Sequence, residues 1–257
     1  MDCMAEECKE HEVSALPGSA RPGERESADK DYEAREVPVL PSSALLNTLS
    51  KLWTYPMSGV DEYKRALSGL ERMFDVEVTG KRVRNEDEQT RKVALQAKQH
   101  AQRELTEELD KLSRAFEEYD TPHETIEGST AFQLDYTRLF IGSLKMYAPP
   151  YASYYIDGDS LLYGPTAAEI ENLYAQFGLE IKKDEHDMPD HIRFLLAFLA
   201  VLAQGYEKGG ERDFALAYAD FKSEYFSSWV GDFKQKICES TEYSYFKVLI
   251  DFTIKMV

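Results

Sequence analysis

Apolar residues recur every three to four positions through most of this chain from Leu45 onward, with polar residues between them. That period places the apolar side chains on one face of a helix, and no convincing pair of strands is visible. The faces are carried by Leu45, Leu49 and Trp53; by Tyr63, Leu67, Leu70 and Phe74; by Leu105, Leu109, Leu112 and Phe116; by Leu134, Leu139 and Phe140; and by Ile170, Leu173, Tyr174 and Phe177. The continuous apolar run from Phe194 to Ala203 predicts a core helix, and residues 213–237 and 240–256 supply the last helices.

The pattern predicts an all-α fold, a single-domain helical bundle of about nine helices. Residues 1–37 lack this period, are rich in Glu, Ser, Gly and Pro, and predict a disordered acidic tail. Folding is expected to begin near Pro41, so the helical domain spans residues 38–257. Within it, the highly charged residues 75–90 surround Gly80 and predict an exposed loop or insertion.

Composition limits the class of partner. Asp and Glu number 47 against 30 Lys and Arg, which gives a formal net charge of -17. This charge argues against a nucleic-acid partner, because phosphates are bound by clusters of Lys and Arg. An acidic surface favours basic partners, including peptides that carry arginines, although the same acidity also keeps a protein soluble.

The cysteines and the apolar runs bear on redox chemistry and location. Cys3, Cys8 and Cys238 form no disulfide framework. His11 lies near the first two, but a structural metal site needs four well-placed ligands, so we predict no metal and no cofactor. The N-terminus is acidic and lacks an apolar run, so no secretory signal is expected. The longest apolar run is about half of the roughly 20 residues that span a bilayer, so we expect a cytoplasmic protein without membrane insertion.

The segment before the apolar run, Asp187-Met188-Pro189-Asp190-His191, carries the first candidate chemistry. Asp187 suits the N-cap of the following helix, Asp190 comes three residues later as in a capping box, and Pro189 is tolerated in a first turn. Capping leaves His191 without a role, because a charged imidazole gains nothing from the helix dipole at this end. The segment is compatible with a cap, a catalytic dyad or a recognition site.

A catalytic dyad needs partners that the sequence does not supply. An Asp–His pair activates a Ser or Cys nucleophile, and no Gly-x-Ser-x-Gly elbow is present. There is no Gly-rich phosphate loop, and the acidic cluster at 184–187 lies in one turn rather than on helices that could share two metals. We therefore predict no catalytic residue. A helical nucleotide-binding or hydrolytic enzyme that uses Asp190 and His191, or a plain helical scaffold, is the alternative.

The second candidate feature is the segment from Ala148 to Tyr155, which combines two adjacent prolines with three tyrosines. A proline holds the residue before it in an extended conformation, so the segment is expected to be an ordered loop. Its aromatic side chains offer contact area to a peptide at low entropic cost. The alternative is a buried connector whose tyrosines lie partly in the core.

Together these segments resemble a known family, the TorD/DmsD/NarJ redox-enzyme maturation chaperones. Residues 136–142 resemble the family's aromatic-x-x-Leu-Phe-x-Gly helix end, and residues 149–155 resemble its Pro-Pro-aromatic-x-Ser-x-Tyr loop. Residues 187–191 are similar to its Glu-Pro-x-Asp-His motif, with Asp187 in place of the Glu and the proline one position later. Residues 221–233 resemble its late helix segment, which ends in Trp-x-x-x-Phe, and the resemblance covers residues 45–257.

The resemblance implies a function that is not catalytic. Members of the family bind the N-terminal leader, often of the twin-arginine type, or the apo form of a molybdopterin-dependent oxidoreductase subunit in the cytoplasm. They assist cofactor insertion and assembly, and some prevent premature export. The resemblance also implies a monomer or a domain-swapped dimer, and weak guanine-nucleotide binding has been proposed for some members. The peptide-binding residues that it implies are Phe140, Gly142, Pro149, Pro150, Tyr151, Ser153, Tyr155, Asp187, Asp190, His191 and Trp229.

Overall fold

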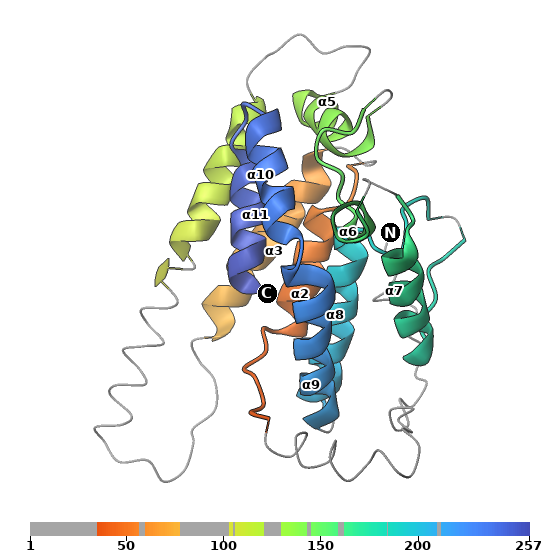
Figure 1. The fold of residues 1–257 in the computed structure, drawn as a ribbon. Coiled ribbons are helices and arrows are strands. Elements are labelled where there is room, and N and C mark those ends of the chain that lie inside the picture. The colour runs from red at the N-terminus through yellow and green to blue at the C-terminus, as the bar shows by residue number, and fades with distance from the viewer. Residues whose placement is uncertain are drawn as a thin grey trace, which may run out of the picture. The chain divides into compact units, whose positions relative to one another are not determined.

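The computed structural model describes residues 35–56, 60–77, 103–104, 106–120, 130–142, 145–158, 162–183, 185–209 and 212–257. Within these ranges the chain forms nine labelled α-helices and a further helical stretch at residues 103–104 and 106–117 (Figure 1). The one β-type pairing in the same ranges is a single bridge between Tyr151 and His191. The predicted all-α fold is confirmed.

Several predictions fall on residues beyond these ranges. They are the acidic tail up to residue 34, the cysteines and histidine near its start, and the charged loop after residue 77. Helix α3 (Val60–Glu77) extends into the segment that was predicted to begin this loop. The tail and the domain boundaries therefore stay predictions.

The described residues divide into two compact units, and each is taken by itself. The first consists of residues 35–50 and 150–232 together with Val257. It holds most of α2 (Ser43–Leu52), all of α6 (Ala152–Ile156), α7 (Pro165–Gln176), α8 (Ile192–Glu207) and α9 (Arg212–Phe221), and a π-helical turn at Lys222–Ser227. Helices α8 and α9 lie side by side (Figure 1).

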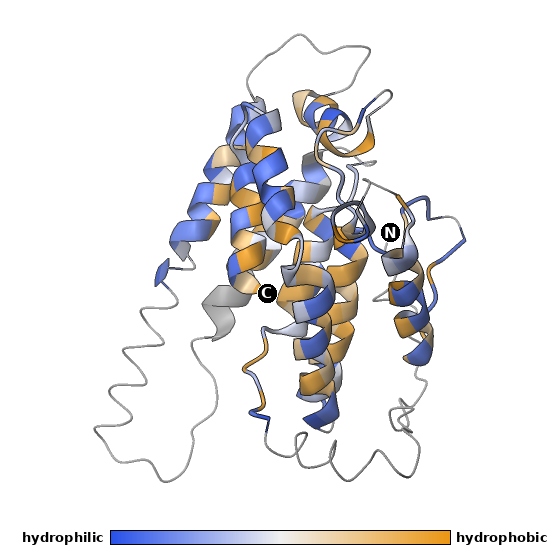
Figure 2. Ribbon diagram, in the orientation of Figure 1, coloured by the Kyte–Doolittle hydropathy of each residue, from blue (hydrophilic) through white to orange (hydrophobic). Residues whose placement is uncertain are grey.

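Helix α8 forms the core of the first unit. Residues 192–200 are all buried, as the apolar run predicts, and Figure 2 shows this helix hydrophobic along most of its length. The ring of Phe198 lies 4.9 Å from that of Tyr174 on α7 and 4.7 Å from that of Phe221 on α9, measured between centroids. Gly205 lets the ring of Phe214 approach so closely that a Cβ would collide with it. Aromatic burial and close helix approach therefore fix α7 and α9 on α8.

The second unit consists of the described residues within 51–149 and 233–256. It holds α3, the helical residues 106–117 with a 3-10 turn at Glu118–Asp120, α5 (Ala131–Tyr136) with a π-helical turn at Thr137–Ile141, most of α10 (Val230–Ser240), and α11 (Tyr245–Met256). Its core is aromatic, and the Phe132 ring stacks on Phe246 with centroids 5.4 Å apart. Trp53 joins the same core, and its Nε1–H donates to Thr253 Oγ1 at 3.1 Å.

Candidate peptide-binding site

Two predicted segments, the proline loop from residue 150 onward and the acidic turn, lie against each other in the first unit through one antiparallel bridge. The prediction of a loop up to Tyr155 is wrong in its second half, because residues 152–156 form helix α6. The amide of Ala152 donates to the carbonyl of Asp190 at 3.1 Å, and the amide of Ile192 donates to the carbonyl of Pro150 at 2.9 Å. The bridge pairs Tyr151 with His191, and their rings meet edge to face with centroids 5.1 Å apart. The two segments therefore lie together in one candidate site.

Asp190 caps helix α6 from the opposite segment. Its Oδ2 accepts a hydrogen bond from the amide of Ser153 at 2.8 Å, in the first turn of a helix whose own N-cap residue provides no side-chain cap. The side chain is fully buried. Burial raises the pKa of Asp190 above its ordinary value, and hydrogen bonds from Ser153 act in the opposite direction. The carboxyl group thus satisfies a main-chain donor that the helix itself leaves open.

His191 is the N-cap residue of α8. Its Nδ1 accepts a hydrogen bond from the amide of Arg193 at 3.1 Å, which satisfies a donor of the first turn. Burial lowers the pKa of His191 to about 4, against the opposing effect of Asp187. The imidazole is therefore neutral at pH 7, and because Nδ1 is the acceptor, its proton lies on Nε2.

These contacts correct the predicted capping. Asp187 is not the N-cap and Asp190 does not complete a capping box, because α8 begins at Ile192, later than predicted. Pro189 lies in the turn before the helix rather than in its first turn, and its carbonyl accepts a hydrogen bond from Tyr174 OH at 3.0 Å. The prediction considered only a charged imidazole, whereas a buried neutral imidazole is a hydrogen-bond acceptor.

Asp187 belongs to an ion-pair cluster around Arg193. The Nε of Arg193 lies 2.7 Å from Asp187 Oδ2, and its Nη2 contacts a carboxylate oxygen of Glu185. The Arg193 side chain is 8% exposed, whereas that of Asp187 is 33% exposed. Burial acts to raise the pKa of Asp187, but Arg193, together with His191 in the acidic range where its imidazole is protonated, outweighs burial and holds the pKa below its ordinary value. Asp187 also accepts a long hydrogen bond of 3.4 Å from Tyr151 OH.

Arg193 is not among the predicted site residues, although the sequence contains a signal for it. A lone cation in the first turn of an apolar helix stays buried only if carboxylates pair with it, and the acidic cluster at 184–187 lies just before it. The guanidinium also lies 4.0 Å from the centroid of the Phe194 ring. The main-chain carbonyl of Arg193 accepts a hydrogen bond from Ser50 Oγ at 2.8 Å, which ties α8 to α2.

Tyr155 and Trp229, two more of the predicted residues, stack on each other in the first unit. Their ring centroids are 5.3 Å apart and the ring planes differ by 23°. Trp229 is buried, and its Nε1–H donates to the carbonyl of Tyr225 at 2.7 Å, within the π-helical turn that precedes it. Tyr155 is half-buried, and burial raises the pKa of its hydroxyl. The π-helical turn, a feature common at functional sites, thus positions the tryptophan under Tyr155.

Phe140, Gly142 and Pro149 belong to the second unit. Phe140 is buried in the aromatic core, with its ring centroid 4.9 Å from that of Phe246. Gly142 ends the π-helical turn with a φ of +51°, where a Cβ would collide with the main chain of Lys145, so the predicted helix end at this glycine is confirmed. Pro149 is buried in the loop. Phe140 and Gly142 therefore have structural roles, and the contact of any of the three with a peptide stays a prediction.

The geometry of the bridge favours holding segments together over proton transfer. His191 Nδ1 accepts from a main-chain amide, so this nitrogen is not available as a base for a nucleophile. In the part of the chain that the structure describes, no three His, Cys, Asp or Glu side chains gather closely enough to hold a metal ion. Over the same residues, no helix combines the length and hydrophobicity that crossing a membrane requires.

Comparison with known proteins places this site within a matched region. The family model described as nitrate reductase delta subunit matches residues 98–235, which include both bridged segments. The chain is 28% identical over 120 residues to the chaperone protein TorD of Vibrio vulnificus (45% of this chain, 56% of that protein) and 30% identical over 116 residues to TorD of Vibrio parahaemolyticus (44% and 54%). The chain spans about half the length of these curated relatives. A crystal structure of a proposed redox enzyme maturation protein from Archaeoglobus fulgidus is similar with a TM-score of 0.46 and 20% identity, covering 87% of this chain and 96% of that one.

Proposed function

Because the chain belongs to the nitrate reductase delta subunit family, we propose that it is a cytoplasmic maturation chaperone rather than an enzyme. Its partner is the apo form, or the N-terminal leader of twin-arginine type, of a molybdopterin-dependent oxidoreductase subunit. It holds this subunit during cofactor insertion and assembly and delays its export. The observation that carries the proposal is the family match across residues 98–235, which includes the proline loop and the acidic turn that the bridge joins.

The charge of the protein supports a basic guest. A leader combines a basic segment with an apolar segment, and a chain with a net charge of -17 attracts the basic one. Such attraction sets orientation and encounter rate, while burial of apolar side chains supplies most of the affinity. Asp187 can offer its carboxylate to this basic segment, since the Asp187 side chain is one third exposed.

The burial of the predicted residues divides them into two groups. Asp190 and His191 are 0% and 2% exposed and engage main-chain amides, so we infer that they position the site without touching the guest. Asp187 and Tyr155 keep part of their surface, so we infer that they contact it. The stacked Trp229 beneath Tyr155 supports that ring as a rigid anchor of the kind that dominates peptide recognition.

Isothermal titration of the full chain with synthetic leaders from the molybdopterin-dependent oxidoreductases of the host tests the proposal. One leader is expected to bind, with an affinity that falls as ionic strength rises, because the basic segment meets an acidic surface. Asp187→Asn should weaken this binding, since it removes the charge and keeps the shape. Glu180→Gln is the matched control, because Glu180 is an exposed carboxylate of the same unit outside the site.

The outcome that would contradict the chaperone proposal is the absence of binding by the folded chain to every leader and every apo subunit tested. Binding that is equally weakened by Asp187→Asn and Glu180→Gln would contradict only the location, because it would report the overall charge of the protein rather than this site.

A further inference from the structure

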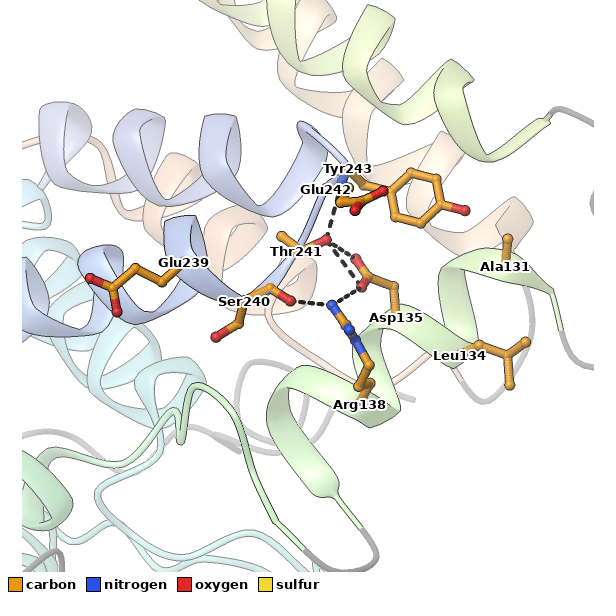
Figure 3. A pocket seen from close by; sticks show the side chains of 9 residues that line it. All are labelled: Ala131, Leu134, Asp135, Arg138, Glu239, Ser240, Thr241, Glu242 and Tyr243. Atoms are coloured by element: carbon orange, nitrogen blue, oxygen red, sulfur yellow. Dashed lines mark hydrogen bonds and ion pairs between the residues drawn. The ribbon is translucent and has the colours of Figure 1, made fainter.

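The second unit contains a pocket of about 680 Å³ at the C-terminal end of α10. Residues 239–243 line it on one side, and Leu134, Asp135 and Arg138 line it on the other (Figure 3). Its volume falls within the range of about 300–1,000 Å³ that is typical of ligand sites. Nothing in the proposed function uses this pocket.

A buried carboxyl group forms one wall of the pocket. Asp135 is 5% exposed and accepts hydrogen bonds from Tyr119 OH at 2.7 Å and from Thr241 Oγ1 at 3.0 and 3.1 Å. Two hydroxyl donors from different segments therefore fix its orientation. A carboxyl group held in this way keeps oxygen lone pairs free for a further donor.

A guanidinium already occupies this pocket. The Nη2 of Arg138 donates to the carbonyl of Ser240, the last residue of α10, and lies 3.9 Å from Asp135 Oδ1 (Figure 3). The guanidinium carbon also lies 5.5 Å from the centroid of the Tyr147 ring. An open carbonyl at a helix C-terminus, a carboxyl group and an aromatic face are the three environments that favour a guanidinium.

The remaining lining is acidic as well. Glu239 and Glu242 are exposed at the rim, where the carboxylate of Glu239 is directed away from Arg138 (Figure 3) and accepts a hydrogen bond from Gln235, so they add negative charge around the pocket without contacting the guanidinium. The side chain of Arg138 is 50% exposed, so it is free to leave without opening the core. Leu134 and the half-buried ring of Tyr243 offer apolar surface to the methylene groups of a long side chain.

We propose that this pocket binds an arginine side chain of a partner polypeptide, and that Arg138 is the internal group it displaces. Arginine is favoured over lysine, because one nitrogen of a guanidinium can donate to the Ser240 carbonyl, as Nη2 of Arg138 does, while its other nitrogens remain donors for the Asp135 carboxyl. The site lies within the second unit and does not depend on the leader-binding site proposed above.

The strength of the contacts that hold Arg138 in the pocket determines how much its removal should change arginine binding. A half-exposed ion pair with a carbonyl contact contributes a modest free energy, so the closed state is favoured by a modest ratio. The apparent affinity for a guest arginine is the intrinsic affinity of the open pocket multiplied by the fraction of molecules in which the pocket is open. Removing Arg138 should therefore tighten arginine binding by roughly threefold to tenfold.

The probe is the peptide acetyl-Ala-Arg-Ala-amide, titrated into the full-length protein and followed by two-dimensional NMR. Its neutral control is the same peptide with citrulline, which has nearly the same shape without the charge. We expect the arginine peptide to shift amide signals of residues 239–243 and to bind about tenfold more tightly than the citrulline peptide. Arg138→Ala should tighten it, and the double variant Glu239→Gln with Glu242→Gln should weaken it.

A second control separates the pocket from overall charge. Glu117→Gln removes an exposed carboxylate of the same unit that does not line the pocket, and it should leave the affinity unchanged. Loss of binding in Arg138→Ala would overturn the proposal, because Arg138 would then contact the ligand instead of competing with it. Equal binding of both peptides, or shifts confined to other residues, would overturn it too. All these positions are exposed, so each variant is expected to fold.

Discussion

Replacement of Asp190 by alanine should destabilise the protein more than replacement by asparagine. The alanine variant lacks the oxygen that accepts a hydrogen bond from the amide of Ser153. In the native protein Ser153 is buried and this hydrogen bond is 2.8 Å long. Asparagine retains an oxygen at the same place, so it can keep the cap of α6. The comparison therefore isolates one hydrogen bond that joins the two segments of the site.

The magnitude follows from the environment of this carboxyl. A buried donor left without a partner costs about 1–3 kcal/mol, and loss of a cap costs about 0.5–2 kcal/mol, so Asp190→Ala should lower the free energy of unfolding by about 1–3 kcal/mol. Burial raises the pKa of Asp190, so ionisation is less favourable in the folded state than in the unfolded chain. This part of the stability is fully present below the unfolded pKa of about 3.9 and is lost as pH rises through the folded pKa.

Urea unfolding at a series of pH values measures both effects. Asp190→Asn should lie near the wild type, and its stability relative to the wild type should rise as pH increases from about 4, since the amide does not ionise. If alanine and asparagine lower the midpoint equally, or if neither does, the carboxyl group does not cap α6. In that case the inference that Asp190 positions the site without touching the guest fails.

Two further substitutions test the neighbouring geometry. His191→Ala should lower the free energy of unfolding by about 0.5–2 kcal/mol, whereas His191→Asn keeps an N-cap acceptor. Because burial lowers the pKa of His191 to about 4, the stability that the neutral imidazole contributes is present above about pH 6.5 and is lost as pH falls through 4. The asparagine variant should therefore flatten the pH dependence of unfolding in that window, and an unchanged slope would contradict a buried neutral imidazole. Gly142→Ala should lower the free energy of unfolding by more than the roughly 1–3 kcal/mol of a strained φ, because a Cβ there would also collide with the main chain of Lys145. Gly158→Ala is the control, since Gly158 also has a positive φ but a Cβ there would meet open space. Equal shifts in melting temperature for the two variants would exclude the collision.

The helices could be predicted from the sequence because their signal is local. The stripe at Leu109, Leu112 and Phe116 is buried as its spacing predicts, and the run from Phe194 to Ala203 forms a core helix. Burial of apolar side chains every three to four residues needs no knowledge of what they pack against. A local signal fixes the end of a helix less well than its middle, because polar residues near a helix end suit a cap at more than one position. The predicted start of α8 is therefore too early.

The candidate site could be predicted only in part, because its contacts join distant segments. The sequence indicated the two segments at 148–155 and 187–191, but it gave no sign that Asp190 caps a helix in the other one. The capping pattern assigned no role to His191, because its neutral state results from burial, which is a tertiary property. Arg193 was missed because it looked like one polar residue in an apolar helix, and its pairing with Glu185 and Asp187 required their positions in space.

The bridge changes what a loss of peptide binding would mean at these positions. Asp190 and His191 provide acceptors at the start of α6 and the start of α8, so a substitution that removes either acceptor is expected to displace Tyr151 in the proline loop and Tyr155 in α6. Binding would then fall whether or not the two side chains touch a guest, and such a result would not identify a contact. An isosteric change at the partly exposed Asp187 removes a charge and leaves the acceptors at both helix starts in place, and Arg193 keeps its other ion pair, with Glu185. The contribution of direct contact is therefore measured at Asp187, and the contribution of positioning is measured by the difference between alanine and asparagine at Asp190.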